Sequence, residues 1–391
     1  MKRLLLPALL LTTLTACTAA PAGTLPAAAP TPTPASTPAP TAAPAPADAL
    51  TQEEKIGQLF IIRPDALDLT LPQETINDAK ADGVTMLTDA MRETLQAYPV
   101  GGICQFGKNI TDPEQLAQFN ADLQATSRTP LFIAVDEEGG AVARLANKDT
   151  FDLPRHESAA AVGASGDPAD ACAMGQTIGA YLKEYGFNMD FAPDADVNTN
   201  PDNPIIGTRA FSSDAATAAE MAAAAADGLR TSGILPTLKH FPGHGDTAED
   251  SHTALAVTYK TLDELQACEL LPFAADTGLH AVMVGHIAAP NVTGDGTPAT
   301  LSPQLVALIP DAENTLIVTD SLAMDAIADA YTPGEAAVLA LQAGCDVLLM
   351  PNSLPEAYAA VLEAVQNGTI SEERLDRSVN KILLYKQQFA S

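Results

Sequence analysis

The chain has 391 residues, of which 20 are Lys or Arg and 49 are Asp or Glu, so its formal net charge is −29. This excess of negative charge argues against nucleic acid as a partner and against adsorption to an anionic membrane surface, because like charges repel. A hydrophobic fraction of 47% excludes a wholly disordered acidic chain, and the length allows one large domain or two ordinary ones.

The first residues have the pattern of a bacterial lipoprotein signal. Lys2 and Arg3 precede an apolar run, residues 4–11, that is too short to span a bilayer, and the sequence Leu-Thr-Ala-Cys ends at Cys17. These four residues resemble a lipobox, in which the cysteine becomes the lipidated N-terminus; an ordinary signal peptide with an incidental Cys17 is the alternative. We therefore expect a signal peptide over residues 1–17 and an extracytoplasmic protein that a lipid on Cys17 anchors to the cell membrane.

Residues 18–49 are predicted to form a disordered linker. They are almost entirely Ala, Pro and Thr, and nine of the 30 prolines of the chain lie between Pro21 and Pro46. Such a composition cannot bury a core and is typical of extended, semi-rigid spacers. Residues 50–391 contain no second linker and no compositional break, which predicts a single domain.

Eight short apolar runs alternate with helical stretches in this domain. The runs are residues 59–62, 101–106, 131–135, 187–191, 235–238, 281–284, 315–318 and 347–350. Near-continuous apolar runs separated by helices indicate parallel βα units whose strands are buried on both faces. Eight units in about 340 residues predict an α/β fold, a (β/α)8 barrel of the TIM type, and a doubly wound open sheet is the alternative.

Two helices and four cysteines allow more local predictions. A helix is expected over residues 215–229 after a cap at Ser213, and a final helix after Ser371 with one apolar stripe, formed by Leu375, Val379, Ile382 and Leu383. Cys104 and Cys345 lie in apolar strand contexts, which favours buried free thiols over a disulfide. Neither these two nor Cys172 and Cys268 have metal-ligand spacing.

Charged or imidazole side chains follow several of the predicted strands. They are Asp136, Asp194, Asp196, Lys239, His240, His286 and Asp320. In a closed parallel barrel the carboxyl ends of the strands converge on one face, where active sites are built. These residues, although far apart in the sequence, are therefore expected to share a single pocket.

The densest group of such residues is the string KHFPGHGDT, residues 239–247, followed by Asp250 and His252. Two glycines flank His244 and permit a tight loop. Asp250 and His252 are two residues apart, so on extended backbone they point the same way, and the carboxylate fixes the tautomer of the imidazole. With an unperturbed pKa of about 6.5, His252 is suited to deliver and retrieve protons near neutrality.

This string, with DSH after it, resembles glycoside hydrolase family 3, specifically its single-domain β-N-acetylglucosaminidase branch, and the resemblance covers residues 53–386. It implies that His252 is the acid/base, oriented by Asp250 on a mobile loop. The segment from Thr319 to Met324 resembles the nucleophile segment of the family, which implies that Asp320 is the attacking carboxylate.

The resemblance also implies a set of substrate-binding residues. The sequence VDEEGG, residues 135–140, resembles the DQEGG segment of the family, with Glu137 in place of the common Gln, and implies that Asp136 accepts hydrogen bonds from sugar hydroxyls. Many relatives have another Arg where Ala141 stands, so contacts here are expected to differ. The other positions that match binding residues are Arg144, Arg209, Lys239 and His240.

Structural roles are expected for several neighbouring polar residues. We expect Asp194 and Asp196 to anchor the mouth of the barrel and His244 to brace its loop. Glu138 is expected to brace the turn at residues 139–140, and His286 is as well explained by a strand-end histidine with satisfied hydrogen bonds as by a site residue. The glycines of the loop and the neighbouring Lys239 argue against a zinc site at His240, His244 and His252, so we expect no metal and no cofactor.

Together these residues predict a retaining exo-β-N-acetylglucosaminidase that hydrolyses terminal β-N-acetylglucosaminides, peptidoglycan fragments or related glycans, through a covalent glycosyl-enzyme. Arg144, Arg209 and Lys239 are expected to surround Asp320 and keep it ionised. Two alternatives stay open: a β-glucosidase or sugar phosphorylase on the same scaffold, and a non-catalytic lipoprotein that binds sugar. Carbohydrate is the expected partner, and the only expected contact with membrane is through the lipid anchor.

Overall fold

The structure is a computed structural model that describes residues 46–248 and 255–390. Asp250 and His252 lie outside these ranges, as do Cys17, the predicted signal peptide and nearly all of the predicted linker. The first described element is a 3-10 helix, Pro46–Ala49, in which Ala47 is buried and its N–H donates to the side chain of Asn380 at 3.0 Å. Within the described ranges, no helix combines the length and the apolar character that a bilayer-spanning segment needs.

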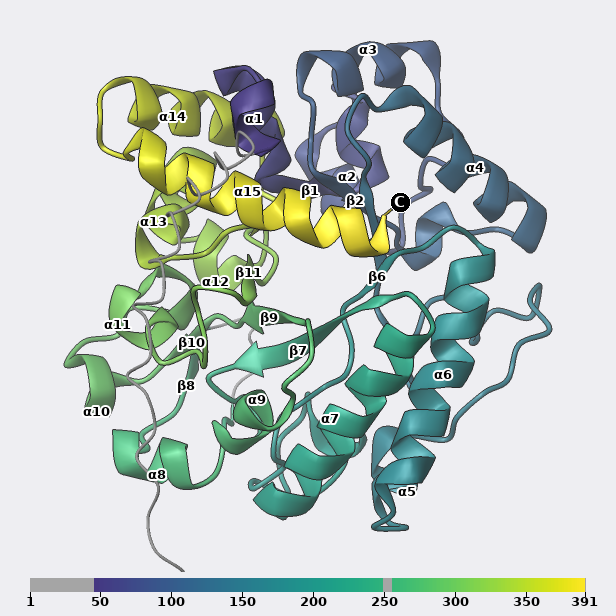
Figure 1. Cartoon of the computed structure of the whole chain (residues 1–391), viewed down its shortest axis with the longest axis vertical. Coiled ribbons are helices and arrows are strands. Elements are labelled where there is room, and N and C mark those ends of the chain that lie inside the picture. Colours follow the sequence, from purple (N-terminus) through teal and green to yellow (C-terminus); the bar gives the residue numbers. More distant parts are fainter. Residues whose placement is uncertain (1–45, 249–254, 391) are drawn as a thin grey trace, which may run out of the picture. The chain divides into compact units, whose positions relative to one another are not determined.

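Eight parallel strands form the central sheet, in the order β11-β9-β7-β6-β3-β2-β1-β12 (Figure 1). Their bounds are β1 Phe60–Ile62, β2 Gly102–Cys104, β3 Phe132–Val135, β6 Met189–Asp190, β7 Leu235–Phe241, β9 Ala281–Val284, β11 Leu316–Thr319 and β12 Leu348–Leu349. A parallel bridge between Val318 and Val347 joins the two ends of this order, so the sheet closes on itself. The predicted (β/α)8 barrel is confirmed, and the open sheet is excluded.

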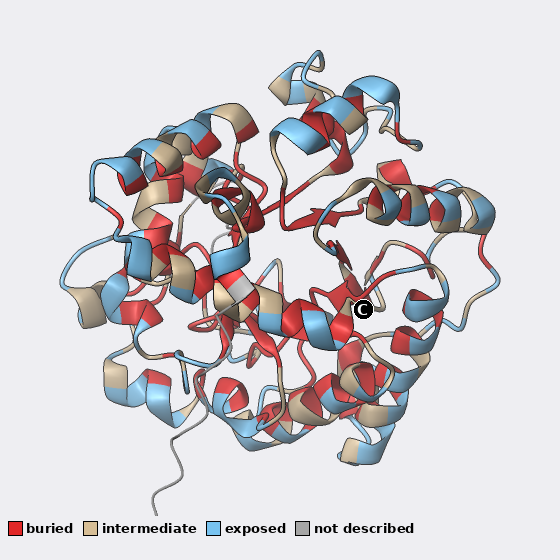
Figure 2. Cartoon of the chain, turned by 45° about the horizontal axis from the view of Figure 1, so that its top comes forward, coloured by how far each residue is buried: buried red, intermediate tan, exposed pale blue. Residues whose placement is uncertain are grey.

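Helices surround the strands (Figure 1). The outer faces of the helices are exposed to solvent, whereas the strands are buried (Figure 2). The helices are α1 Gln52–Gln58, α2 Gln73–Asn77, α3 Asp89–Ala97, α4 Pro113–Thr126, α5 Ala159–Gly163, α6 Pro168–Glu184, α7 Ala215–Thr231, α8 Leu262–Ala267, α9 Leu271–Ala275, α10 Pro290–Thr293, α11 Pro303–Val306, α12 Asp325–Ala328, α13 Pro333–Ala343, α14 Leu354–Gln366 and α15 Glu372–Phe389. Two pairs of short strands lie outside the barrel sheet: β4 Glu137–Gly139 with β5 Val142–Ala143, and β8 Ala256–Val257 with β10 Ile287–Ala288.

Capping residues set the helix starts. Ser371 accepts a hydrogen bond from the N–H of Arg374 and begins α15, as predicted. The cap of α7 is Asp214, whose carboxylate accepts from the N–H of Thr217 at 2.9 Å; the prediction of Ser213 is therefore wrong by one residue. Ser and Asp are both good N-cap residues, so when they are adjacent the sequence alone does not show which of them caps the helix.

Small residues bring α6 and α7 together on the outside of the barrel. A Cβ atom on Gly175 would lie 2.2 Å from the carbonyl oxygen of Ala225, and one on Gly228 would lie 2.2 Å from that of Cys172. The alanine-rich composition of α7 thus allows close backbone packing. Cys104 and Cys345 are buried and unpaired, as predicted, and Cys172 and Cys268 are also free.

The last helix covers the amino ends of the strands. The hydroxyl of Tyr385 shares its one hydrogen between the carbonyl oxygens of His280, at 3.0 Å, and Asn314, at 2.9 Å, which precede β9 and β11. The buried Lys386 lies over the ring of Phe132 at the start of β3. This end of the barrel is therefore closed, and the loops at the opposite, carboxyl ends of the strands are left to form a site.

Candidate active site

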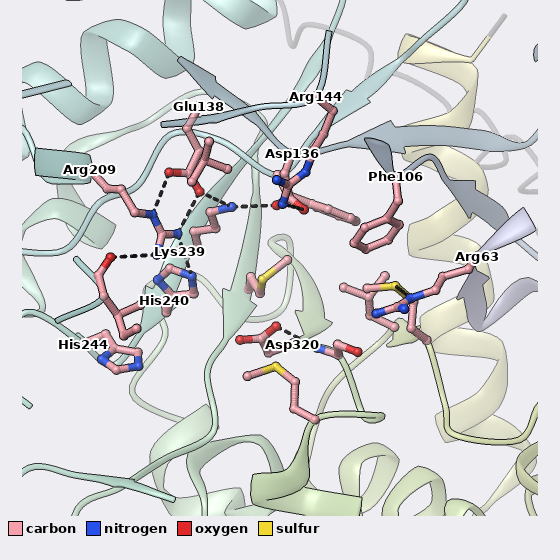
Figure 3. A pocket seen from close by; sticks show the side chains of 18 residues that line it. Arg63, Phe106, Asp136, Glu138, Arg144, Arg209, Lys239, His240, His244 and Asp320 are labelled. Atoms are coloured by element: carbon pink, nitrogen blue, oxygen red, sulfur yellow. Dashed lines mark hydrogen bonds and ion pairs between the residues drawn. The ribbon is translucent and has the colours of Figure 1, made fainter. Parts of the chain in front are cut away.

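A pocket opens where the carboxyl ends of the strands converge (Figure 3). It brings together six of the predicted site residues, which are Asp136, Arg144, Arg209, Lys239, His240 and Asp320. They lie at or after the carboxyl ends of β3, β6, β7 and β11. Residues far apart in the sequence are therefore brought together by the closure of the barrel. Apolar side chains supply the rest of the wall, among them Val142, Phe191, Ile205, Met283, Met324 and Leu349.

A chain of ion pairs, in which acidic and basic side chains alternate, runs along one side of the pocket. Lys239 Nζ lies 2.8 Å from Asp136 Oδ1 and 2.6 Å from Glu138 Oε1. Glu138 also accepts from Nε and Nη2 of Arg209, each at 2.8 Å. The side chains of Lys239 and Glu138 are each only 3% exposed, so these ion pairs are screened little by solvent. The network fixes the direction in which each cation and each carboxylate faces the pocket (Figure 3).

The network keeps its members ionised. Burial alone would raise the pKa of Glu138, but Lys239 and Arg209 outweigh it and hold that pKa well below its usual range. Burial likewise opposes the charge of Asp136, yet Lys239 and Arg144 lower its pKa. Burial would lower the pKa of Lys239, whereas the two carboxylates raise it.

Glu138 is a site residue that the sequence reasoning missed, as are Arg63 and Phe106, which also line the pocket. Glu138 was expected to brace the turn at residues 139–140, but its carboxylate holds Arg209 and Lys239. The three cations expected near Asp320 line the same pocket as that residue. The ion-pair partners of Arg144, Arg209 and Lys239 within 4.0 Å are Asp136, Glu138 and Asp194.

Glu137 holds the segment that carries Arg144. Its buried carboxylate accepts from the backbone N–H groups of residues 144, 145 and 146, at 2.5, 2.9 and 2.9 Å, and from the hydroxyl of Tyr181 at 2.9 Å. All four partners are donors, and a carboxylate can accept from every one, whereas an amide would turn its NH2 group toward some of them. This explains why Glu suits the position where Gln is common in the family that the sequence resembles.

Asp196 fixes the orientation of His240 and the start of the KHFPGHGDT loop. Its Oδ2 lies 2.8 Å from His240 Nδ1, and its Oδ1 accepts from the N–H of His244 at 2.7 Å. Burial opposes the charge of Asp196, but His240 lowers its pKa, so the carboxylate only accepts and Nδ1 carries a proton. Burial lowers the pKa of His240, and Asp196 outweighs it and raises that pKa. Nε2 of His240 then faces Arg209 Nη2 at 3.4 Å.

Glycines let the same loop pack closely. Gly243 has φ +123°, and a Cβ atom on Gly245 would lie 1.9 Å from the carbonyl oxygen of Val197. The hydroxyl of Thr258 donates to Asp246 Oδ2 at 2.7 Å and joins the loop to the chain ahead of α8. His244 braces this loop through its N–H and through Nδ1, which lies 2.6 Å from the hydroxyl of Thr247.

Asp194, Asp196 and His240 each offer one possible metal-ligand atom, and these atoms lie within 4.8 Å of one another. No other cluster of this kind occurs among residues 46–248 and 255–390. Burial and the charge of Asp196 raise the pKa of Asp194, while Arg209 Nε lies 3.5 Å from its Oδ2. Asp196 and His240 pair with each other, whereas Asp194 Oδ2 has no hydrogen-bond partner, and the guanidinium of Arg209 near it disfavours an added cation.

Asp320 follows β11 at the floor of the pocket. Its Oδ1 accepts from the N–H of Ser321 at 2.7 Å, and its own N–H donates to the carbonyl oxygen of Val284 at 2.9 Å. His286 supports the segment behind it: Nε2 lies 2.8 Å from the carbonyl oxygen of Ser321, which only accepts, so Nε2 carries a proton. Within residues 46–248 and 255–390, His286 thus supports the segment of Asp320 and is not among the side chains that line the pocket.

Residues 51–384 match the family model described as the glycosyl hydrolase family 3 N terminal domain. Beta-hexosaminidase A of Pseudoalteromonas piscicida is 32% identical over 335 residues, which cover 78% of this chain and 56% of the relative. Beta-hexosaminidase LpqI of Mycobacterium tuberculosis is 33% identical over 347 residues, with 81% and 83% covered.

A solved structure is also similar. It is a glycoside hydrolase family 3 beta-N-acetylglucosaminidase from Paenibacillus sp. FPU-7, with a TM-score of 0.78 and 37% sequence identity over 87% of this chain and 63% of that protein. The chain thus spans less than two thirds of the length of the P. piscicida and Paenibacillus relatives.

Proposed function

Because this chain belongs to glycosyl hydrolase family 3, we propose that it is a retaining exo-β-N-acetylglucosaminidase that hydrolyses terminal β-N-acetylglucosaminides, among them fragments of peptidoglycan. One observation carries this proposal: Asp320 lies in a single pocket with the network of Asp136, Lys239, Glu138 and Arg209. A pocket with a carboxylate at its floor and fixed polar groups on its wall suits a terminal sugar whose C1 meets the carboxylate. The names of the relatives, beta-hexosaminidase and beta-N-acetylglucosaminidase, support the same substrate class.

In the proposed reaction, a carboxylate oxygen of Asp320 attacks C1 of the sugar while the bond from C1 to the leaving oxygen breaks. His252, oriented by Asp250, gives its proton to that oxygen and the covalent glycosyl-enzyme forms. His252 then takes a proton from water, the water oxygen attacks C1, and the bond to Asp320 breaks. Two displacements at C1 give net retention.

The charge network has a binding role in this reaction. Asp136 offers carboxylate oxygens to sugar hydroxyls, and Lys239 and Arg209 offer N–H donors whose directions Glu138 fixes. Because each charge already has a partner, the wall can bind a neutral sugar without leaving an uncompensated ion. Groups held in place before the substrate arrives lower the entropic cost of orienting it.

The test uses the full-length protein with 4-nitrophenyl N-acetyl-β-D-glucosaminide and the matching glucoside, each with and without phosphate. We expect cleavage of the N-acetylglucosaminide at a rate that does not depend on phosphate. Asp320→Asn should lower kcat on the order of a thousandfold or more, whereas the control Asp170→Asn, on the exposed first turn of α6, should keep it.

Each other outcome rejects part of the proposal. A preference for the glucoside rejects the substrate, and a need for phosphate rejects hydrolysis. Near-normal turnover by Asp320→Asn rejects the nucleophile. Absence of turnover on both compounds, with the protein folded, rejects an enzyme of this specificity and favours a protein that only binds sugar.

The second part of the proposal concerns location. The lipobox ending at Cys17 and the proline-rich stretch after it support a lipid anchor followed by a spacer that holds the domain away from the membrane. In a bacterial host fed a palmitate analogue, the full-length protein should incorporate the label and sediment with membranes. Cys17→Ser should do neither, and a labelled Cys17→Ser variant contradicts the assignment.

A further inference from the structure

Arg63, Phe106 and Arg144 form one wall of the pocket, which we call the arginine wall (Figure 3). They follow β1, β2 and β3, three neighbouring strands of the barrel. The guanidinium carbon of Arg63 lies 4.4 Å from the centre of the Phe106 ring and that of Arg144 lies 6.0 Å from it. Two cations thus flank one aromatic ring on the same side of the pocket.

Arg63 is held by hydrogen bonds to its neighbours, and the carboxylates that act on its charge, Asp65 and Asp136, lie beyond 4.0 Å. Its Nη1 donates to the carbonyl oxygens of Ile76 and Asn77, both at 3.1 Å, and its Nε lies 3.2 Å from Met350 Sδ. Among residues 46–248 and 255–390, no carboxylate oxygen lies within 4.0 Å of Arg63, and its Nη2 makes no hydrogen bond. A half-buried guanidinium with an unused donor edge is suited to an anion that arrives with the ligand.

The carboxylates on this side of the barrel are held by other cations. Asp65 lies 3.5 Å from Lys108 Nζ and accepts from Asn109 at 2.8 Å, and Asp136 lies 2.8 Å from Lys239 Nζ. Arg144 reaches Asp136 only at 3.6 Å, and its buried Nε has no hydrogen-bond partner. Nη2 of Arg63 is therefore the donor of the arginine wall that remains for a further anion, and Arg144 adds a second positive charge.

The barrel places this wall away from the proposed point of cleavage. Asp320 follows β11, and the chain that leads to the proposed acid/base follows β7. In the closed strand order, β7, β9 and β11 are consecutive, and β1, β2 and β3 are consecutive on the other side. With C1 of the sugar at Asp320, the side of the pyranose ring that carries C4 and C6 would lie toward the arginine wall, because C4 is opposite C1 in the ring and C6 is attached to the neighbouring C5.

We propose that the arginine wall is a subsite for a sulfate or phosphate ester on the 4- or 6-hydroxyl side of the terminal N-acetylglucosamine. This inference rests on the proposed function and specifies its substrate class: terminal sugars that carry an anion, in addition to neutral ones. Arg63 is the specificity-determining residue, since its donor edge is unused, and Arg144 is the second cation. Guanidinium groups suit such oxyanions because their donors lie in a planar fork.

The experiment compares 4-nitrophenyl N-acetyl-β-D-glucosaminide with its 6-O-sulfate, using the full-length protein. We expect kcat/KM for the sulfate to be at least one tenth of that for the neutral compound. Added salt should lower kcat/KM for the sulfate and leave that for the neutral compound unchanged. Arg63→Gln should lower the ratio of the two values by about tenfold to a hundredfold, the effect of one charged hydrogen bond.

Two further variants make the result specific. Arg63→Lys keeps the charge and should retain most of the ratio. Arg128→Gln makes the same change of charge at a side chain that is 83% exposed outside the pocket and should leave the ratio unchanged. Melting temperatures show whether each variant folds. If Arg63→Gln does not fold, the proposal is judged from the ratio of wild type, the salt dependence of that ratio and the ratio of Arg63→Lys.

The outcomes separate this inference from the proposed function. Cleavage of neither compound rejects the function. Cleavage of the neutral compound with a sulfate ratio below one tenth rejects the arginine wall as an anion subsite and leaves the function standing. A high ratio that is insensitive to salt, or that Arg63→Gln leaves unchanged, also rejects it, because another feature then accepts the sulfate.

Discussion

Glu138 is the residue on which the geometry of the pocket depends, and Glu138→Gln tests this directly. The carboxylate makes three contacts: Arg209 Nε and Nη2 at 2.8 Å each and Lys239 Nζ at 2.6 Å. A glutamine has the same shape, but its amide group carries no charge and turns its NH2 group toward at least one cation. Two buried cations then share only Asp136 and Asp194.

Breaking a buried ion pair by removing one partner costs about 3–5 kcal/mol. A domain of about 340 residues has an unfolding entropy of about 0.7 kcal/mol per degree at its midpoint, so the expected decrease in Tm is about 4–7 °C. KM for the N-acetylglucosaminide should also rise, because Arg209 and Lys239 lose their fixed directions. Thermal melting followed by circular dichroism and steady-state kinetics measure the two effects, and Glu363→Gln, exposed on α14, is the control with the same change of charge.

The pH dependence of this effect has a defined sign. The pKa of Glu138 in the folded protein lies below its unfolded value of about 4.5, so its contribution to stability is complete above pH 4.5 and is lost as the pH falls through the folded pKa. The Tm difference between wild type and Glu138→Gln should therefore be constant from pH 8 to 5 and shrink below pH 4.5. A variant that melts within 1 °C of wild type at pH 7 refutes this reasoning.

Three further changes have expected outcomes. Burial raises the pKa of Asp190 well above its unfolded value, and its Oδ2 has no hydrogen-bond partner, so wild type loses stability as the pH rises above about 4. Asp190→Asn should raise Tm at pH 7 and not at pH 4, and an equal or lower Tm at pH 7 contradicts this. Asp196→Asn removes the negative charge and one of the two acceptor oxygens that hold His240 and His244, so KM should rise about tenfold and the pKa of His240, followed by NMR titration of its imidazole, should fall. A lower Tm with unchanged KM and unchanged pKa indicates a structural role alone. Burial lowers the pKa of Lys386 to about 7, so between that pH and about 10.5 the unfolded chain binds more protons and stability rises with pH. Lys386→Met should be more stable than wild type at pH 6, by a difference in Tm that narrows as the pH rises above 7 and vanishes only near pH 10.5. A difference that stays constant between pH 6 and 9 contradicts this assignment.

The barrel could be predicted from the sequence because its strands are buried on both faces. Such strands are mainly apolar, and each of the eight predicted runs overlaps one strand. The predicted ends of the strands were less accurate than the predicted number of strands. The run at residues 235–238 stops where polarity begins, but β7 continues through Lys239 and His240 to Phe241. These two side chains remain in a buried strand because Glu138 and Asp196 pair with them, and no local pattern reports those contacts.

The same reason limits what could be predicted of the site. Asp136 and Asp320 directly follow strands and Lys239 lies near the end of one. Because the barrel topology brings the carboxyl end of every strand to one face, their meeting followed from the fold. Glu138 was missed because its partner Arg209 lies 71 residues away, whereas the adjacent glycines indicated a turn. Asp250 and His252 lie outside the described residues, so their roles stay predictions.

The pairing of charges also decides which ligands the pocket suits. A neutral sugar needs donors and acceptors in fixed directions, and a network of ion pairs supplies both with little net charge. Three cations around one carboxylate, without further acidic partners, would instead attract anions in general. In the structure Lys239 and Arg209 are neutralised by Asp136 and Glu138, and Arg63 is the pocket cation without a carboxylate within 4.0 Å among the described residues. Anion recognition is thus confined to one wall, where it can select substituted sugars without weakening the binding of unsubstituted ones.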